Sequence, residues 1–157
     1  YYQGGPLEHV IAGKAICFKE AQSDEFKAYA QHIIENTALC QETLSGLGAI
    51  TSKTDNHLFL LNTLDSYNLT GLEAQIMLEN VGITTNKNMI PNDKLTPKET
   101  SGLRIGFAAI TTRGCNKEVA IKIGELIHKV LSKKISEEEA KNEVRSLTKS
   151  MKKIENI

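Results

Sequence analysis

Arginine and net charge are both scarce in this chain of 157 residues. Only three of its 19 basic residues are arginine, and 19 acidic residues bring the formal net charge to zero. A general surface for nucleic acid or for an anionic membrane needs an excess of basic side chains. We therefore expect neither nucleic acid nor a membrane among the partners of this chain.

Long apolar runs and paired cysteines are also missing. No stretch approaches the roughly 20 apolar residues of a membrane-spanning helix. The three cysteines, Cys17, Cys40 and Cys115, are widely spaced and form no CxxC pair. This pattern argues against a disulfide framework or a zinc knuckle and predicts reduced thiols in a cytoplasmic protein. The sequence also shows no catalytic triad, paired-carboxylate motif, metal-ligand spacing or P-loop, so we expect no metal site.

What the sequence does contain is a succession of helical and extended patterns. Apolar residues at helical spacing predict helices over 7–21, 23–46, 69–83, 116–133 and 136–155. Short apolar runs predict strands over 49–52, 57–63 and 101–109, with 83–88 as an extended edge or loop and 89–100 as an irregular loop. These elements predict an α+β fold, with a three- to four-stranded antiparallel or mixed sheet covered by helices. The first helix is apolar nearly all round, so we predict that it is buried.

Polar residues mark where several of these helices begin. Ser23 is placed to cap the second helix, because its hydroxyl can accept a hydrogen bond from a free N–H of the first turn. Thr70 with Glu73, and Ser136 with Glu139, have the spacing of capping boxes. The sequence therefore predicts helix starts at these three places.

Two of the three arginines lie in one glycine-flanked run, TSGLRIGFAAITTRG, at residues 100–114. Arg104 stands between Leu103 and Ile105 in a predicted strand. One interpretation is an exposed strand residue or a structural ion pair, because burying an unpaired charge costs several kcal/mol. The other is a clamp for a substrate carboxylate, since the guanidinium offers a planar fork that lysine cannot reproduce.

Two smaller features are candidates for binding. Gly4 and Gly5 precede Pro6 and the first helix, where bare backbone N–H groups near the positive end of a helix dipole suit a phosphate. A flexible turn is the simpler interpretation of this pair. Asn88 lies in the run NKN beside a proline-bearing loop, and its amide is able to hydrogen-bond a heteroaromatic ring, although loop asparagines more often serve turns.

Five segments taken together are more specific than any one of them. They are QGGPLEHVIAGKA, TDNHL, LTGLEA, GITTNKN.IPND and TSGLRIG.AAITTRG. In this order they resemble the carboxy-terminal portion of serine hydroxymethyltransferase, the pyridoxal-phosphate enzyme that interconverts serine and glycine using tetrahydrofolate. The resemblance runs from residue 3 to about residue 131.

The resemblance implies a role for each candidate residue. Arg104 matches the family's arginine that binds the carboxylate of serine or glycine. Asn88 matches a residue that contacts the pteridine ring of the folate. Gly4 and Gly5 match a turn whose backbone N–H groups bind the cofactor phosphate of the neighbouring subunit in a homodimer. The expected ligands are therefore pyridoxal 5'-phosphate, serine, glycine and tetrahydrofolate, and the expected partner is a second copy of the full-length chain.

The resemblance also implies how the chain is organised. We expect a connecting helix over 1–22, preceded by the phosphate-binding turn, and a small carboxy-terminal domain over 23–157. That domain would be like the small domain of fold-type I pyridoxal-phosphate transferases. The chain begins in the middle of a motif, as a part of a longer protein would.

Two features depart from the family pattern. Phe107 and Ala108 stand where Thr-Pro is usual, so the exit from the strand is expected to differ, with Arg104 unaffected. The Schiff-base lysine, which the family carries in a Thr-Thr-His-Lys run upstream of QGGP, is absent from this chain. We therefore expect no catalytic residue in this segment and no activity from the segment alone.

Two functions from different classes follow. The first is the small domain of a pyridoxal-phosphate transferase that moves a one-carbon unit between serine and tetrahydrofolate. The second is a free-standing binding or regulatory module that kept the fold without catalysis. The small domain of an aminotransferase is disfavoured by NKN and TDNHL, which resemble the folate enzyme.

Overall fold

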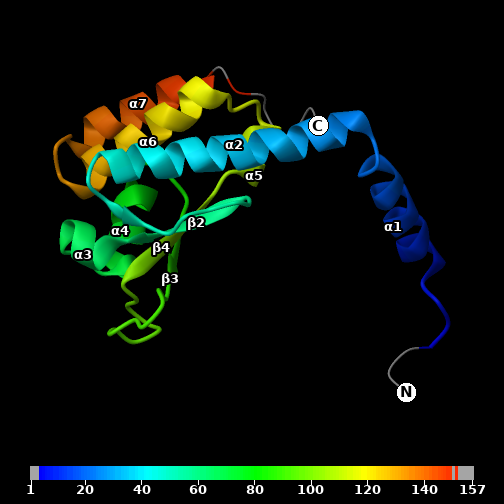
Figure 1. The fold of residues 1–157 in the computed structure, drawn as a ribbon, viewed down its shortest axis with the longest axis horizontal. Helices are drawn as coiled ribbons and strands as arrows, with labels where there is room; N and C mark the ends of the chain where they lie inside the picture. Colours follow the sequence, from blue (N-terminus) through cyan, green and yellow to red (C-terminus); the bar gives the residue numbers. More distant parts are fainter. Residues whose placement is uncertain (1–3, 150, 152–157) are drawn as a thin grey trace. The chain divides into compact units, whose positions relative to one another are not determined.

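The computed structural model describes residues 4–149 and 151, and the chain divides into two compact units, Tyr1–Gln31 and His32–Ile157. Helix α1 (Glu8–Glu20) and the first residues of α2 (Asp24–Gly46) belong to the first unit. The second unit holds the rest of α2, the whole sheet and five further helices (Figure 1). The sheet and the helices that cover it therefore lie within one unit.

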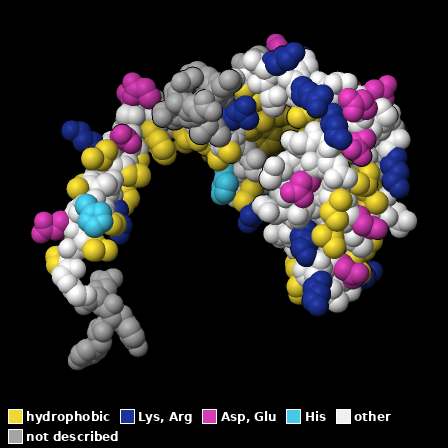
Figure 2. Space-filling view, turned by 180° about the vertical axis from the view of Figure 1, so that it is seen from behind, with side chains coloured by type: hydrophobic (Ala, Val, Ile, Leu, Met, Phe, Trp, Pro, Cys, Tyr) yellow, Lys and Arg dark blue, Asp and Glu magenta, His cyan; other side chains and the backbone are white. Residues whose placement is uncertain are grey.

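The prediction that the first helix is buried is wrong for this structure. Every residue of α1 is exposed, including Ile16 and Phe18, whose side chains are 60% and 65% exposed. Hydrophobic side chains gather along this helix in the space-filling view (Figure 2). The sequence pattern records that the helix is apolar, but it does not say which surface covers it. Exposed apolar area on this scale is typical of an interaction surface.

The sheet has four strands in the order β1-β2-β4-β3, and every neighbouring pair is antiparallel. The strands are β1 (Ile50–Thr51), β2 (Leu58–Asn62), β3 (Asn86–Asn88) and β4 (Gly102–Gly106). The predicted α+β class and the antiparallel sheet flanked by helices are confirmed. The segment predicted as an edge or loop supplies the edge strand β3.

One face of the sheet carries the core. Phe59 and Leu61 of β2 and Leu103 and Ile105 of β4 are all at most 5% exposed. Helices α4 (Gly71–Asn80) and α6 (Lys117–Leu131) cover this face together with the part of α2 that follows residue 32, and α7 (Glu137–Lys149) packs on α6 (Figure 1). Because side chains alternate along a strand, the residues between these four point to the opposite face.

The predicted helix starts are confirmed by their hydrogen bonds. The Thr70 hydroxyl accepts from the Glu73 N–H at 3.1 Å, and the Glu73 carboxylate accepts from the Thr70 N–H at 2.8 Å. Ser136 and Glu139 form the same reciprocal pair at the start of α7. The Ser23 hydroxyl accepts from the backbone N–H three residues later. Each pair satisfies N–H groups that have no partner inside the helix.

Two short helices that the sequence did not predict begin at the ends of two predicted strands, which are therefore shorter than predicted. Helix α3 (Thr63–Tyr67) follows β2 directly, because Asn62 accepts the Asp65 N–H on its side-chain oxygen and caps a helical turn. Helix α5 (Ala108–Thr112) begins two residues after β4 ends, and Phe107 between them has left the extended region with φ −113° and ψ 1°. The predicted last helix ends at Lys149 in the described chain, and most of its remaining predicted residues lie outside the described part.

A buried amide also ties the second unit together. Asn36 of α2 is 2% exposed, and its Nδ2 donates to Thr111 Oγ1 at 3.1 Å and to the Cys115 carbonyl at 2.9 Å. These bonds connect α2 to α5 and to the turn before α6. A buried polar side chain needs such partners, since leaving it unpaired costs about 1–3 kcal/mol.

Candidate functional site

Arg104 lies on the face of the sheet opposite the core. It is the middle residue of β4, and it pairs with Leu60 of β2 on one side and with Asn86 of β3 on the other. Its two neighbours in sequence, Leu103 and Ile105, point into the core and are buried, whereas Arg104 is exposed. The alternation of the strand therefore presents the guanidinium on the open face.

The charge of Arg104 has no protein counter-charge in the described part of the chain. The cross-strand neighbours Leu60 and Asn86 are uncharged, and the guanidinium makes no hydrogen bond or ion pair with any residue that the structure describes. Arg104 therefore forms no structural ion pair with the described residues. The arrangement fits an exposed strand residue, and it leaves the fork open to an external anion.

Asn88 ends the neighbouring strand on the same face. It pairs with Gly102, two residues before Arg104, so Asn88 and Arg104 are diagonal neighbours across the β3–β4 ladder. Such diagonal positions are about 7–8 Å apart, within reach of long side chains. The amide nitrogen of Asn88 donates to the Met89 carbonyl at 2.7 Å, and its amide oxygen accepts no bond from the residues that the structure covers. That oxygen is available to a donor on a ligand.

Gly102 is required where the two strands meet. A Cβ on this residue would lie 2.5 Å from the Ile90 Cγ2 atom, 3.0 Å from the Leu61 carbonyl oxygen and 3.1 Å from the Asn88 carbonyl oxygen. Two of these atoms belong to strand backbones that cannot move far. The missing side chain at Gly102 lets the chain after β3 fold back over the start of β4. Close packing therefore explains why a glycine stands at this position.

Asp93 is the residue of this region that the sequence did not single out. Its carboxylate accepts four hydrogen bonds, from the N–H groups of Ile90, Leu95 and Ser101 and from the Ser101 hydroxyl. Partial burial raises its pKa, but the bonds from Ser101, Leu95 and Ile90 lower it by more, and the net result is a pKa of about 2. The loop predicted to be irregular is therefore organised around one ionised carboxylate. An aspartate after asparagine, as in PND, is a common turn signal and could have pointed to it.

We expect this carboxylate to make the fold sensitive to acid. The pKa in the folded chain lies below the ordinary value of 3.8, so the contribution is complete above that value and is lost as the pH falls from about 4 toward 2. Asp93→Asn should lower the free energy of unfolding near neutral pH by about 1.5–3 kcal/mol, the scale of one lost bond to a charged acceptor. Urea unfolding of both proteins between about pH 7 and pH 2 would measure the difference, which should shrink at the acid end. A difference that stays constant with pH would contradict this account.

Gly4 and Gly5 belong to the other unit, just before α1. Both are exposed, and a Cβ on either would meet no atom within 4 Å. Their backbone N–H groups donate to no acceptor within the described residues. The turn is therefore open and unoccupied by side chains, which is the form a phosphate-binding turn takes. The structure brings Arg104 and Asn88 together on one sheet face, and it describes the two glycines in a separate unit.

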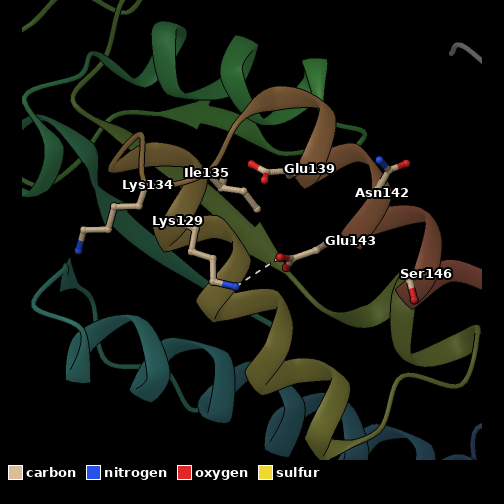
Figure 3. Close-up of a pocket in the computed structure, with 7 residues that line it drawn as sticks. All are labelled: Lys129, Lys134, Ile135, Glu139, Asn142, Glu143 and Ser146. Atoms are coloured by element: carbon tan, nitrogen blue, oxygen red, sulfur yellow. Dashed lines mark hydrogen bonds and ion pairs between the residues drawn. The ribbon is translucent and has the colours of Figure 1, made fainter.

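Two hollows lie elsewhere in the second unit. The groove in Figure 3 runs between α6 and α7, where Lys129 and Glu143 point toward each other in an ion pair of 3.4 Å. A second cavity, of about 330 Å³, is mainly apolar and lies on the core side of the sheet, beside Ile105 and Phe107. Neither is lined by Arg104 or Asn88. The candidate site is accordingly an open sheet face rather than one of these two hollows.

The described part of the chain holds neither a metal-binding cluster nor a membrane-spanning helix. Within residues 4–149 and 151, no group of three or more His, Cys, Asp or Glu side chains is placed to hold a metal ion. No helix in the same residues has both the length and the apolar character needed to cross a membrane.

Comparison with known proteins gives one consistent family. A family model described as serine hydroxymethyltransferase matches residues 1–127. The serine hydroxymethyltransferase of Methanospirillum hungatei JF-1 is 49% identical over 131 residues, covering 82% of this chain and 31% of the relative. That of Mycoplasma mobile is 44% identical over 157 residues, covering 95% of this chain and 38% of the relative. A probable serine hydroxymethyltransferase of Mesomycoplasma hyopneumoniae (strain 7448) is 46% identical over 154 residues. The chain spans about a third of the length of these curated relatives.

Proposed function

This chain belongs to the serine hydroxymethyltransferase family, and from that premise we propose that it is part of an enzyme that transfers a one-carbon unit between serine and tetrahydrofolate. The observation that carries the proposal is the exposed guanidinium of Arg104 beside Asn88 on the open face of the sheet. The segment would supply binding groups to a site that other parts of the full-length protein complete.

The role of Arg104 in this proposal is to hold the amino-acid substrate. Its planar fork accepts a carboxylate through two parallel hydrogen bonds, which fixes both the position and the orientation of serine or glycine. Strand β4 is one of the two central strands of the sheet and is paired on both sides. Its backbone is therefore rigid, and it holds the Cα of Arg104 in a fixed position. Orientation matters, since the bond to be broken must be aligned with the reacting group.

Asn88 would hold the second substrate. Its free amide oxygen is an acceptor, and the pteridine ring of a folate presents N–H donors at its edge. The position of Asn88 next to Arg104 would then place the folate and the amino acid side by side. A one-carbon transfer needs such proximity, because two substrates must meet at one centre.

Gly4 and Gly5 fit the phosphate of pyridoxal phosphate. The turn is free of side chains, its N–H groups have no acceptor within the described residues, and it precedes a helix N-terminus, so an anion there would meet donors and a favourable dipole. When bound, this cofactor supplies the electron sink that lets bonds at the amino-acid Cα break. We propose that the turn serves the cofactor of a second copy of the full-length chain. The exposed apolar side chains of α1 support a surface that is covered in the assembled protein. We expect the assembled protein in the cytoplasm.

The full-length protein tests this function directly. Purified with pyridoxal phosphate, it should convert serine to glycine only when tetrahydrofolate is supplied, and the 157-residue segment alone should show no turnover under the same conditions. A full-length protein that folds and binds serine or folate without turnover would instead support a binding or regulatory module. Turnover by the segment alone, at a defined stoichiometry of cofactor, would contradict its role as an incomplete part.

A further inference from the structure

The ladder that places Asn88 beside Arg104 is only three residue pairs long, and a long loop leaves from its end. The pair Asn88 and Gly102 is the last one of the β3–β4 ladder, and residues 89–101 then leave the sheet and return. Hairpin loops usually have about 2–5 residues, so a loop of this length does not fix strand register by its backbone alone. A side chain that contacts both ends of the loop would reinforce the register at this end of the ladder.

The carboxylate of Asp93 does this. Its Oδ2 atom accepts the N–H of Ile90, two residues after Asn88, at 3.1 Å, and the N–H of Ser101, next to Gly102, at 2.9 Å. One oxygen therefore joins the outgoing and the returning ends of the loop. The other oxygen, Oδ1, accepts the Ser101 hydroxyl at 2.6 Å and the Leu95 N–H at 2.9 Å.

The rest of the loop is tied to rigid elements on both sides. The Ser101 carbonyl accepts the N–H groups of Thr63 and Leu64 at 2.9 and 3.2 Å, which fixes the start of β4 to α3. On the other side, the Lys87 N–H donates to the Gln75 side chain of α4 at 2.8 Å. The Lys87 ammonium donates to the Lys98 carbonyl, which joins β3 to the loop. The Asp93 carboxylate thus reinforces, at the loop end, the register that places Asn88 beside Arg104.

We propose that Asp93 is a positioning residue that sets where the folate contact of Asn88 lies relative to the carboxylate contact of Arg104. The proposal rests on the function proposed above. It assigns to one carboxylate, which touches neither substrate, control over the binding of both. A substitution of Asp93 should therefore weaken the binding of the amino acid and of the folate together. A substitution of Arg104 or Asn88 should weaken the binding of only one of them.

The test is steady-state kinetics of the full-length enzyme carrying Asp93→Asn. The asparagine amide replaces one of the two acceptor oxygens by an N–H₂ group, which cannot accept a hydrogen bond. At least one of the four bonds is therefore lost, and the N–H₂ group lies against a donor of the loop. We expect the KM values for serine and for tetrahydrofolate to rise together, each by about tenfold. Cofactor affinity should stay within about twofold, because the phosphate turn is remote in sequence and belongs to the other unit. Asp55→Asn is the matched control, since Asp55 is exposed and accepts only a long bond of 3.4 Å from its neighbour Asn56.

A second variant keeps the proposal testable if Asp93→Asn fails to fold. Ser101→Ala removes only the bond from the hydroxyl to Oδ1 and leaves three others in place. It should raise both KM values by a smaller factor, about two- to fivefold. Assays are run well below the thermal midpoint of each variant, so that lost stability does not enter the kinetics. Folded variants with both KM values unchanged, or with only one of them raised, would overturn the positioning role. A wild-type enzyme without serine hydroxymethyl transfer would overturn the proposed function instead.

Discussion

Replacing Arg104 by lysine in the full-length protein should weaken the binding of serine and glycine by about 10- to 150-fold while the cofactor stays bound. The positive charge is kept, but the planar fork is lost, and a charge-assisted hydrogen bond of this kind is worth about 1.5–3 kcal/mol. The exposed position of Arg104 on β4 means that the substitution leaves no buried group unpaired. Stability should therefore change little.

The measurement is the dissociation constant of glycine and the KM of serine, together with the visible absorption of the bound cofactor. Arg145→Lys is the matched control, because it makes the same chemical change on an exposed helix, α7, remote from the sheet face. Near-normal KM and kcat for serine in Arg104→Lys would show that the clamp assignment is wrong. A parallel loss in both variants would point to a general effect of the substitution.

Gly5→Val should lower cofactor affinity in the proposed full-length homodimer by about 1–3 kcal/mol, the scale of one or two lost charge-assisted bonds. A side chain at this turn would hold the backbone away from the phosphate and remove a close N–H contact. In the single chain a Cβ at Gly5 meets no atom within 4 Å, so the substitution has no steric reason to disturb the fold. Gly46→Val is the control, since Gly46 is exposed at the end of α2 and its Cβ also meets no atom within 4 Å.

A mixed dimer decides which subunit the turn serves. One subunit carries Gly5→Val, and the other lacks the Schiff-base lysine that the family places upstream of this segment. If the turn acts across the interface, the only subunit able to join the cofactor faces the intact turn of its neighbour and should hold the cofactor normally. Weak cofactor binding in that mixed dimer would mean that the turn serves its own subunit, and the assignment of Gly4 and Gly5 across the interface would fail.

Local signals in the sequence determined much of the fold. Capping residues such as Thr70 with Glu73 act within three residues of each other, so their pattern is visible in the sequence and the structure reproduces it. The alternation of β4 is equally local: Leu103 and Ile105 are apolar and Arg104 is charged, so one face had to be core and the other open. Family membership also followed from ordered motifs, because these are properties of the chain alone.

Tertiary structure decided what no local pattern records. Every residue of α1 is exposed in this structure, because an apolar helix pattern does not record whether another surface covers the helix. The hydrogen bonds of Asn36 to residues 75 and 79 positions away exist only once α2 lies beside α5. Such a residue looks like an ordinary helix position until the chain has folded.

The candidate site divides in the same way. The sequence alone selected Arg104 and Asn88 as candidates, because each lies in a distinctive motif. Their adjacency came from the antiparallel register of β3 and β4, and the importance of Asp93 came from donors on both ends of a 13-residue loop that converge on one carboxylate. Convergence of this kind is a property of distance in space. A loop sequence rich in turn-forming residues is compatible with many backbone conformations. Only the folded chain shows the conformation in which one aspartate binds both ends of the loop.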